Sequence, residues 1–172
     1  NVFLLMTRAL TSVQRVGEVL REEPAIASPP RAIATVPDGS IELDHVSFRY
    51  NASAAEDVLH DVCLTVPAGS TVGVLGGTGS GKRSLVQLLA RLYDASDGHV
   101  LVGGHDVRDY DLEALRRSVG VVLQTSVLFS GTVRENLLWG RADACDAELL
   151  EACRVAAVDE FLDRSGGLDA DL

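Results

Sequence analysis

The sequence predicts an α/β fold whose centre is a strand, a glycine-rich loop and an amphipathic helix, with antiparallel strands before it. Residues 71–75, TVGVL, are almost all apolar, as in a strand that is buried on both faces. Four glycines follow within residues 76–81, and leucines at helical spacing come after the loop. Residues 41–50 and 58–66 alternate apolar and polar side chains, which is typical of antiparallel strands with one solvated face.

The first 40 residues are predicted to form a helix and a linker. Over residues 1–23, apolar side chains recur at spacings of three and four, at Leu10, Val13, Val16 and Val19. This helix either packs on its own domain or, as its length and narrow apolar stripe favour, is the tail of a preceding domain. Residues 24–40 contain four of the five prolines and are predicted to be an extended linker. Residues 41–172 then form one further domain.

Further strands and turns are marked by local signals. The alternation of the first strand slips in phase between Leu43 and Val46, which indicates a bulge. Residues 67–69, Pro-Ala-Gly, turn the chain after the second strand. Residues 118–123, SVGVVL, are predicted to be a second buried strand that ends at Gln124.

Helices are predicted where capping residues precede apolar periodicity. Asp111 caps a helix that reaches Arg117. Thr132 and Glu135 have the spacing of a capping box, for a helix that ends near Trp139. Residues 146–164 are predicted to make one or two further helices.

Composition excludes several classes of function. The formal net charge of -10 argues against a general nucleic-acid role, because the field would repel a polyanion. The three cysteines and four histidines lack metal-ligand spacing, so the cysteines are predicted to be reduced, partly buried thiols and a metal site made by the protein alone is not expected. The early apolar run at residues 2–6 is far shorter than the roughly 20 residues that cross a bilayer.

The glycine-rich loop carries the strongest chemical signal. Gly76, Gly81 and Lys82 stand at the spacing of the phosphate-binding P-loop, G-x-x-x-x-G-K-[ST], also called Walker A. Glycines let the backbone wrap around phosphate oxygens, and successive N–H groups with the start of a helix attract the anion. Lys82 is the single lysine among fifteen basic residues, and a compact ammonium suits this role better than a guanidinium.

Other readings of the loop fit less well. The dinucleotide fingerprint G-x-G-x-x-G does not match, because Gly77, Gly79 and Gly81 are followed directly by lysine. A glycine-rich turn without a ligand is disfavoured by the strand–loop–lysine–helix order.

Several blocks of residues 41–172 resemble the nucleotide-binding domain of ABC transporters of the exporter type. The block IELDHVSFRY resembles the strand that ends in an adenine-stacking aromatic residue. The blocks LTVPAGSTVGVLGGTGSGKRSLVQLLARL and SVGVVLQTSVLFSGTVRENLLWG resemble the P-loop region and the glutamine-loop region. The block ALTSVQRVGEVLREEPAI resembles the helix that leaves the last membrane span of these exporters. The resemblance implies a P-loop NTPase core with an N-terminal antiparallel β-subdomain, present in part and preceded by a helix from a membrane domain.

The resemblance also implies roles for individual residues. Tyr50 would stack on adenine, Lys82 would act on the terminal phosphates, and Gln124 would contact Mg²⁺ or the attacking water. Lys82 and Gln124 are therefore the expected catalytic residues, and Gln124 is the expected metal contact. The expected nucleotide-binding residues are Tyr50, Val58, Gly76, Gly77, Thr78, Gly79, Ser80, Gly81, Lys82, Arg83 and Ser84.

The sequence departs from the family pattern in two ways. Arg83 stands where the P-loop has a Ser or Thr whose hydroxyl ligates Mg²⁺, and arginine cannot ligate a cation. Ser84 lies about 100° further round the helix and is not expected to replace that ligand. The sequence also ends before the position of the signature motif, the second acidic motif and the switch histidine, so whether this chain itself hydrolyses ATP is left open.

The sequence therefore predicts the ATP-binding portion of an ABC exporter, which couples ATP binding and hydrolysis to transport across a membrane. The expected ligands are ATP and Mg²⁺. The expected partners are a transmembrane domain, in the same chain or another, and a second nucleotide-binding domain, at the cytoplasmic face of the cell membrane. The main alternative is a non-hydrolysing regulatory nucleotide-binding module, which Arg83 favours. A soluble P-loop kinase is a third reading, against which Tyr50 and the Gln124 block speak.

Overall fold

The computed structural model describes residues 2–22, 24–51, 56–125 and 127–172, and of residues 2–5, 7, 9 and 10 only the backbone. The chain divides into two units, Asn1–Gly120 and Val121–Leu172. The elements of the first unit are α1 (Val2–Arg21), β1 (Ile41–Phe48), β2 (Leu59–Val66), α2 (Lys82–Leu89), β3 (Asp97–Val102), β4 (His105–Asp106), the 3₁₀ turn η1 (Val107–Asp109) and α3 (Leu112–Ser118). Those of the second are α4 (Val133–Leu138), α5 (Asp146–Val155), α6 (Asp159–Ser165) and η2 (Gly167–Asp169).

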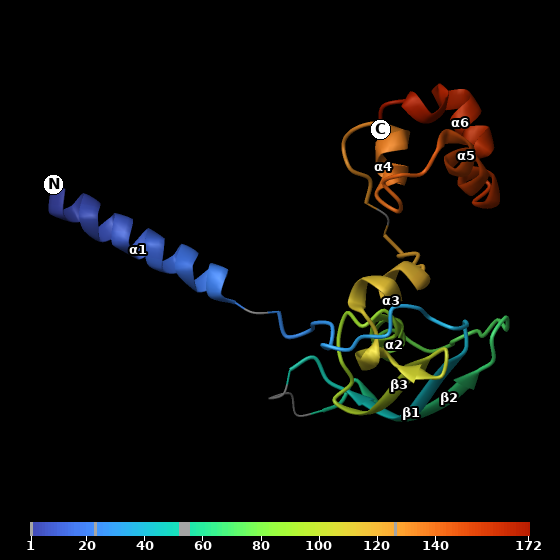
Figure 1. Cartoon of the computed structure of the whole chain (residues 1–172), viewed down its shortest axis with the longest axis horizontal. Coiled ribbons are helices and arrows are strands. Elements are labelled where there is room, and N and C mark those ends of the chain that lie inside the picture. Colours follow the sequence, from blue (N-terminus) through green and yellow to red (C-terminus); the bar gives the residue numbers. More distant parts are fainter. Residues whose placement is uncertain (1, 23, 52–55, 126) are drawn as a thin grey trace. The chain divides into compact units, whose positions relative to one another are not determined.

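The strands of the first unit form an antiparallel sheet in the order β2-β1-β3-β4 (Figure 1). The prediction of antiparallel strands ahead of the P-loop is therefore confirmed. The predicted bulge is also present, because the register of β1 against β2 shifts between Leu43 and Val46. His45 lies between them with a left-handed backbone, at φ 50°.

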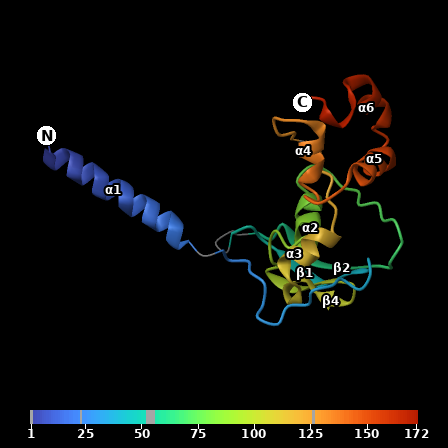
Figure 2. The ribbon, with the colours of Figure 1, turned by 45° about the horizontal axis from the view of Figure 1, so that its top comes forward.

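The core of the first unit lies between this sheet and the helices α2 and α3 (Figures 1 and 2). Val46 and Phe48 of β1 are buried against Leu88 of α2 and Leu115 of α3. Tyr110 is also fully buried, and its hydroxyl donates to the Val102 carbonyl oxygen at 2.7 Å. This bond satisfies the one polar atom of the side chain and anchors the chain just before α3.

Both predicted buried strands, 71–75 and 118–123, are wrong. Residues 71–75 form no strand, and Leu75 is 95% exposed. Ser118 ends α3, and residues 119–123 continue without regular structure, with Val122 97% exposed. A strand buried on both faces needs a hydrogen-bonded neighbour at each edge, and among the described residues neither segment pairs with one. Apolar composition alone therefore predicted burial that the described chain does not provide.

The predicted N-terminal helix is confirmed as α1. Val13, Val16 and Val19 are exposed along it, and Leu10 lies outside the described side chains. No helix in the described ranges has both the length and the apolarity needed to cross a bilayer. The following segment, 24–40, is extended, but it is held to the domain at Ile33, which forms a parallel bridge with Tyr110.

The second unit confirms the predicted helices. The Thr132 side chain accepts the Glu135 N–H, and the Glu135 carboxylate accepts the Thr132 N–H at 2.9 Å, which completes the capping box of α4. Residues 146–164 form the two helices α5 and α6. Cys153 is buried in the core of this unit, and burial raises the pKa of its thiol. The other two cysteines, Cys63 and Cys145, are exposed, which corrects the prediction that the thiols are partly buried.

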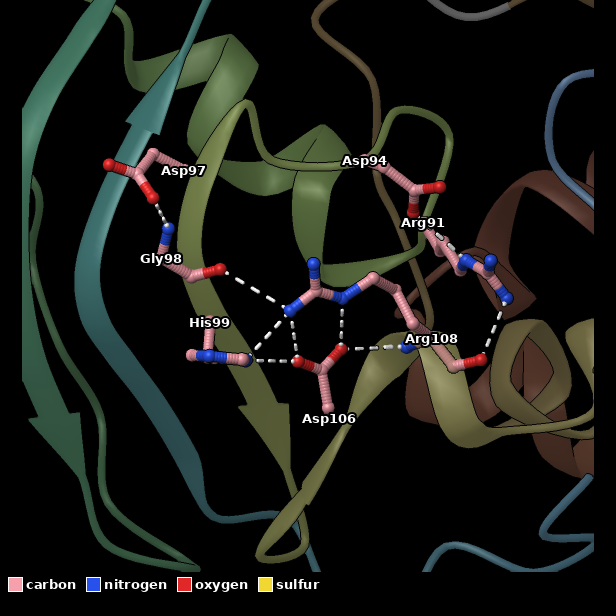
Figure 3. A network of polar contacts seen from close by, with 7 residues as sticks. All are labelled: Arg91, Asp94, Asp97, Gly98, His99, Asp106 and Arg108. Atoms are coloured by element: carbon pink, nitrogen blue, oxygen red, sulfur yellow. Dashed lines mark hydrogen bonds and ion pairs between the residues drawn. The ribbon is translucent and has the colours of Figure 1, made fainter.

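A hydrogen-bonded network ties η1 to the strand β3 (Figure 3). The Arg108 guanidinium donates from Nε to Asp106 Oδ1 at 2.9 Å and from a terminal nitrogen to Oδ2 at 2.6 Å. The same nitrogen donates to the Gly98 carbonyl oxygen at 3.3 Å, and His99 lies against the second carboxylate oxygen. Burial alone would raise the pKa of Asp106, but the hydrogen bonds from Arg108 and His99 outweigh it and lower the pKa to about 2.

Acid is expected to weaken the first unit through Asp106. Because the pKa of Asp106 is lower in the folded than in the unfolded chain, its stabilising contribution is complete above about pH 4 and is lost as the pH falls towards 2. By pH 3 the loss is about 1 kcal/mol, after allowance for solvent screening. Urea unfolding at pH 7 and pH 3 measures it, and Asp106→Asn should shrink the difference between the two. The control Asp163→Asn should leave the difference unchanged, and an equal acid loss in both variants would contradict this role for Asp106.

Candidate phosphate-binding site

The P-loop lies between the turn at 67–69 and α2, and its glycines have the backbone that the motif requires. Gly79 and Gly81 both lie at φ 81°, a left-handed conformation that glycine adopts without strain. A Cβ atom at Gly81 would stand 2.6 Å from Leu59 Cδ2 and 2.9 Å from the Val58 carbonyl oxygen. Only glycine therefore fits at Gly81, where α2 begins against the start of β2.

Lys82 folds back into the loop. Its ammonium donates to the carbonyl oxygens of Gly76 at 2.6 Å and Gly77 at 2.7 Å, and to Ser80 Oγ at 3.1 Å. All three N–H bonds of the ammonium are thus used within the loop. This arrangement places a full positive charge among the residues that the motif assigns to phosphate.

The first turn of α2 adds backbone donors beside that charge. The first intrahelical bond of α2 runs from the Leu85 N–H to the Gly81 carbonyl oxygen at 3.0 Å. The N–H groups of residues 82–84 precede this bond and have no acceptor further back in the helix. Free N–H groups and the positive end of the helix dipole attract anions, so the loop and helix together can hold phosphate.

Tyr50 lies beside the same helix. Its hydroxyl is 2.8 Å from Ser84 Oγ and donates to Gln87 Oε1 at 2.9 Å. Its ring meets Phe48 and Tyr93 edge-on, with centroids 4.8 Å and 5.1 Å away. The ring is nevertheless 49% exposed, so an aromatic surface is held next to the phosphate-binding loop and is open to a planar ligand.

Gln87 and Tyr93, which hold the Tyr50 side chain, were not predicted as site residues. Gln87 follows Ser84 by three positions, which places both on one face of α2. That spacing is the one signal in the sequence that could have suggested a shared partner. Nothing in the sequence marks Tyr93 for contact with Tyr50, because the two come together only through the fold.

Arg83 and Ser84 do not supply the hydroxyl that a P-loop offers to Mg²⁺. The Arg83 side chain is exposed, and among the described residues it has no hydrogen bond or ion pair. Ser84 is 4% exposed and its hydroxyl is engaged by Tyr50. The start of α2 therefore does not fit the usual Mg²⁺ coordination.

The structure brings most of the predicted site residues together in the first unit. Val58 joins the set through its N–H, which donates to the Phe48 carbonyl oxygen at 2.7 Å, and through its carbonyl beside Gly81. Gln124 belongs to the second unit, where it is exposed at a bend of the chain. The predicted residues gathered around the loop are Tyr50, Val58, Gly76, Gly77, Thr78, Gly79, Ser80, Gly81, Lys82, Arg83 and Ser84.

A glycine loop around an ammonium, at the start of a helix in an α/β unit, defines a P-loop nucleotide-binding domain. The chain belongs to the ABC transporter family, whose sequence model matches residues 59–169. The resemblance found in the sequence is thereby confirmed.

The relatives are of the exporter type. YgaD of Bacillus subtilis (strain 168), named as a multidrug export ATP-binding/permease protein, is 42% identical over 163 residues, which are 94% of this chain and 28% of YgaD. CyaB of Bordetella pertussis, a cyclolysin secretion/processing ATP-binding protein, is 43% identical over 151 residues, which are 88% of this chain and 21% of CyaB. Among solved structures, a bacterial Atm1-family ABC exporter with ATP bound matches 99% of this chain and 30% of its own, at a TM-score of 0.87 and 32% identity.

These matches confirm the predicted fold class, an ABC ATPase fold with an antiparallel β-subdomain. They support the reading as the ATP-binding component of an exporter, and they give no support to the alternative of a regulatory module. The chain spans less than a third of the length of these relatives.

Proposed function

We propose that this chain binds ATP as part of an ABC exporter, in which ATP binding and hydrolysis drive transport across a membrane. The observation that carries the proposal is the P-loop itself, with Lys82 held among its carbonyls and Gly79 and Gly81 in left-handed conformations. In this proposal the phosphates replace the loop carbonyls as partners of the Lys82 ammonium, and adenine lies on the exposed face of Tyr50.

The partners follow from the same reading. A transmembrane domain, in this protein or a partner, supplies the transport path, and a second nucleotide-binding domain closes over the bound ATP. The helix α1 connects to the membrane domain, and the site lies at the cytoplasmic face of the cell membrane. Gln124 and the second unit contact the attacking water and the membrane domain. The whole cycle needs residues beyond those described, so ATP binding is the step that this chain can test alone.

The uniqueness of Lys82 allows a direct test of ATP binding. An amine-acylating reagent can modify only Lys82 and the chain's amino terminus, because no other lysine is present. ATP is expected to protect Lys82 and to leave the terminal amine unprotected, as mass spectrometry of the two peptides measures. Equal acylation of Lys82 with and without saturating ATP would refute the proposed site.

Arg83 is expected to make ATP binding less dependent on Mg²⁺. The guanidinium stands near the phosphates in place of a hydroxyl ligand, so it lowers the repulsion that Mg²⁺ otherwise relieves. Arg83→Ser should raise the ratio of the ATP dissociation constants without and with Mg²⁺ by about fivefold or more, the effect of roughly 1 kcal/mol. Calorimetric titration in EDTA and in Mg²⁺ measures the ratio. Arg31→Ser, which removes an exposed arginine outside the loop, is the matched control. The same ratio in the unmodified chain and in Arg83→Ser would contradict this role.

A further inference from the structure

Two bulges lie side by side in the sheet, on either side of the cross-strand pair Val46 and Val62. In β1, His45 is the extra residue between Leu43 and Val46. In β2, the register shifts again between the pairs Val46–Val62 and Phe48–Leu59, and Asp61 lies in this interval. His45 and Asp61 have left-handed backbones, at φ 50° and 48°, which re-aim their side chains relative to a regular strand.

The bulges gather three side chains with metal-binding atoms on the exposed face of the sheet. His45 Nδ1 lies 2.6 Å from Asp61 Oδ1, with side chains 70% and 61% exposed. Cys63 follows Asp61 by two residues on the same strand, so it points to the same face, and it is a free, exposed thiol. One ligand atom from each of the three residues lies within 4.8 Å of the other two.

We propose that His45, Asp61 and Cys63 form a binding site for a divalent ion of the zinc type. An imidazole nitrogen, a carboxylate oxygen and a thiolate are the three donor kinds that Zn²⁺ takes in proteins, whereas Mg²⁺ and Ca²⁺ prefer oxygen alone. In a tetrahedral zinc site, neighbouring ligand atoms stand roughly 3.3–3.8 Å apart, given bond lengths of 2.0–2.3 Å. Rotations of three exposed side chains bridge the difference, and water takes the fourth position.

The backbone that carries the ligands is held from several directions. Gly98 of β3 lies under the first bulge, where a Cβ atom would stand 2.3 Å from the His45 carbonyl oxygen. The Asp61 N–H donates to Ser47 Oγ at 3.0 Å, which fixes the second bulge. The metal-binding atoms are therefore positioned by a sheet and not by a loop, and such rigidity favours a defined geometry.

This site is separate from the P-loop and does not depend on the proposed function. The ion ties β1 to β2 across two bulges, where the ladder of backbone hydrogen bonds is interrupted. Binding to the folded chain alone also raises its stability. The expected signature is therefore a bound ion with a thiolate ligand, together with a higher unfolding temperature.

The test is titration of the chain, reduced and free of any affinity tag, with Zn²⁺ and with Co²⁺ as a spectroscopic probe. One ion per chain is expected, with a thiolate-to-Co²⁺ charge-transfer band and a Zn²⁺-dependent rise in the unfolding midpoint. Cys63→Ser should abolish the band and weaken Zn²⁺ binding by about tenfold or more. His45→Asn should weaken Zn²⁺ binding similarly, and asparagine tolerates the left-handed backbone at that position.

Matched controls come from the same chain. Cys145→Ser removes the other exposed thiol, and His60→Gln removes an exposed histidine from β2 next to the site. Both control variants should bind Zn²⁺ like the unmodified chain. Undiminished binding in Cys63→Ser, loss of binding in Cys145→Ser, or no Co²⁺ band in the unmodified chain would each overturn the proposal.

Discussion

Replacing Lys82 with alanine is expected to weaken ATP binding by about 10- to 150-fold, because hydrogen bonds to a charged group are worth roughly 1.5–3 kcal/mol. The Lys82 ammonium already lies among the loop carbonyls, within reach of any phosphate that enters. No second lysine can take its place. Calorimetric or fluorescent-nucleotide titration of the two chains measures the loss.

Lys82→Arg is the matched variant for this prediction. It keeps the positive charge but replaces a compact ammonium with a planar guanidinium, which cannot repeat the three contacts to Gly76, Gly77 and Ser80. Its affinity should lie closer to that of Lys82→Ala than to that of the unmodified chain. ATP binding that survives in Lys82→Ala would show that the loop does not hold the phosphates.

Gly98→Ala is expected to destabilise the first unit by about 2–5 kcal/mol, as the sum of a left-handed backbone penalty and overpacking. Gly98 lies at φ 79°, and its Cβ atom would stand 2.3 Å and 2.5 Å from the carbonyl oxygens of His45 and Asp44. These atoms are backbone in the adjacent strand, so relief requires the sheet to shift. Urea unfolding followed by far-UV circular dichroism measures the change.

Gly104→Ala separates the two causes. Gly104 has a similar conformation, at φ 77°, but a Cβ atom there would meet no atom within 4 Å. This variant should lose only the backbone part, about 1–2 kcal/mol. Equal losses in the two variants would show that the close approach at Gly98 is not a source of stability.

The sequence was sufficient for elements whose signals are local. Asp111 and the Thr132–Glu135 capping box predicted helix starts that the structure confirms, because a cap forms between residues three positions apart. The bulge in β1 was visible as a slip of alternation for the same reason. The buried strands at 71–75 and 118–123 failed because strand formation depends on partners elsewhere, which apolar composition does not reveal.

The candidate site divides in the same way. The loop and Lys82 were predictable, since the motif is contiguous and its glycines perform a backbone task. The bond between Tyr50 and Ser84 was not, although both had been named, because it joins residues 34 positions apart. The cluster of His45, Asp61 and Cys63 was missed outright, since spacing rules assume regular strands and two left-handed residues change where these side chains point.

The self-contacts of Lys82 have one more consequence, for the entropy of binding. An empty loop of glycines has many conformations, and ordering it on binding would oppose association. Here the ammonium already draws Gly76, Gly77 and Ser80 around one positive centre. The loop is thus preorganised around the same charge that a phosphate seeks, and an arriving anion exchanges partners with the lysine instead of ordering a disordered chain.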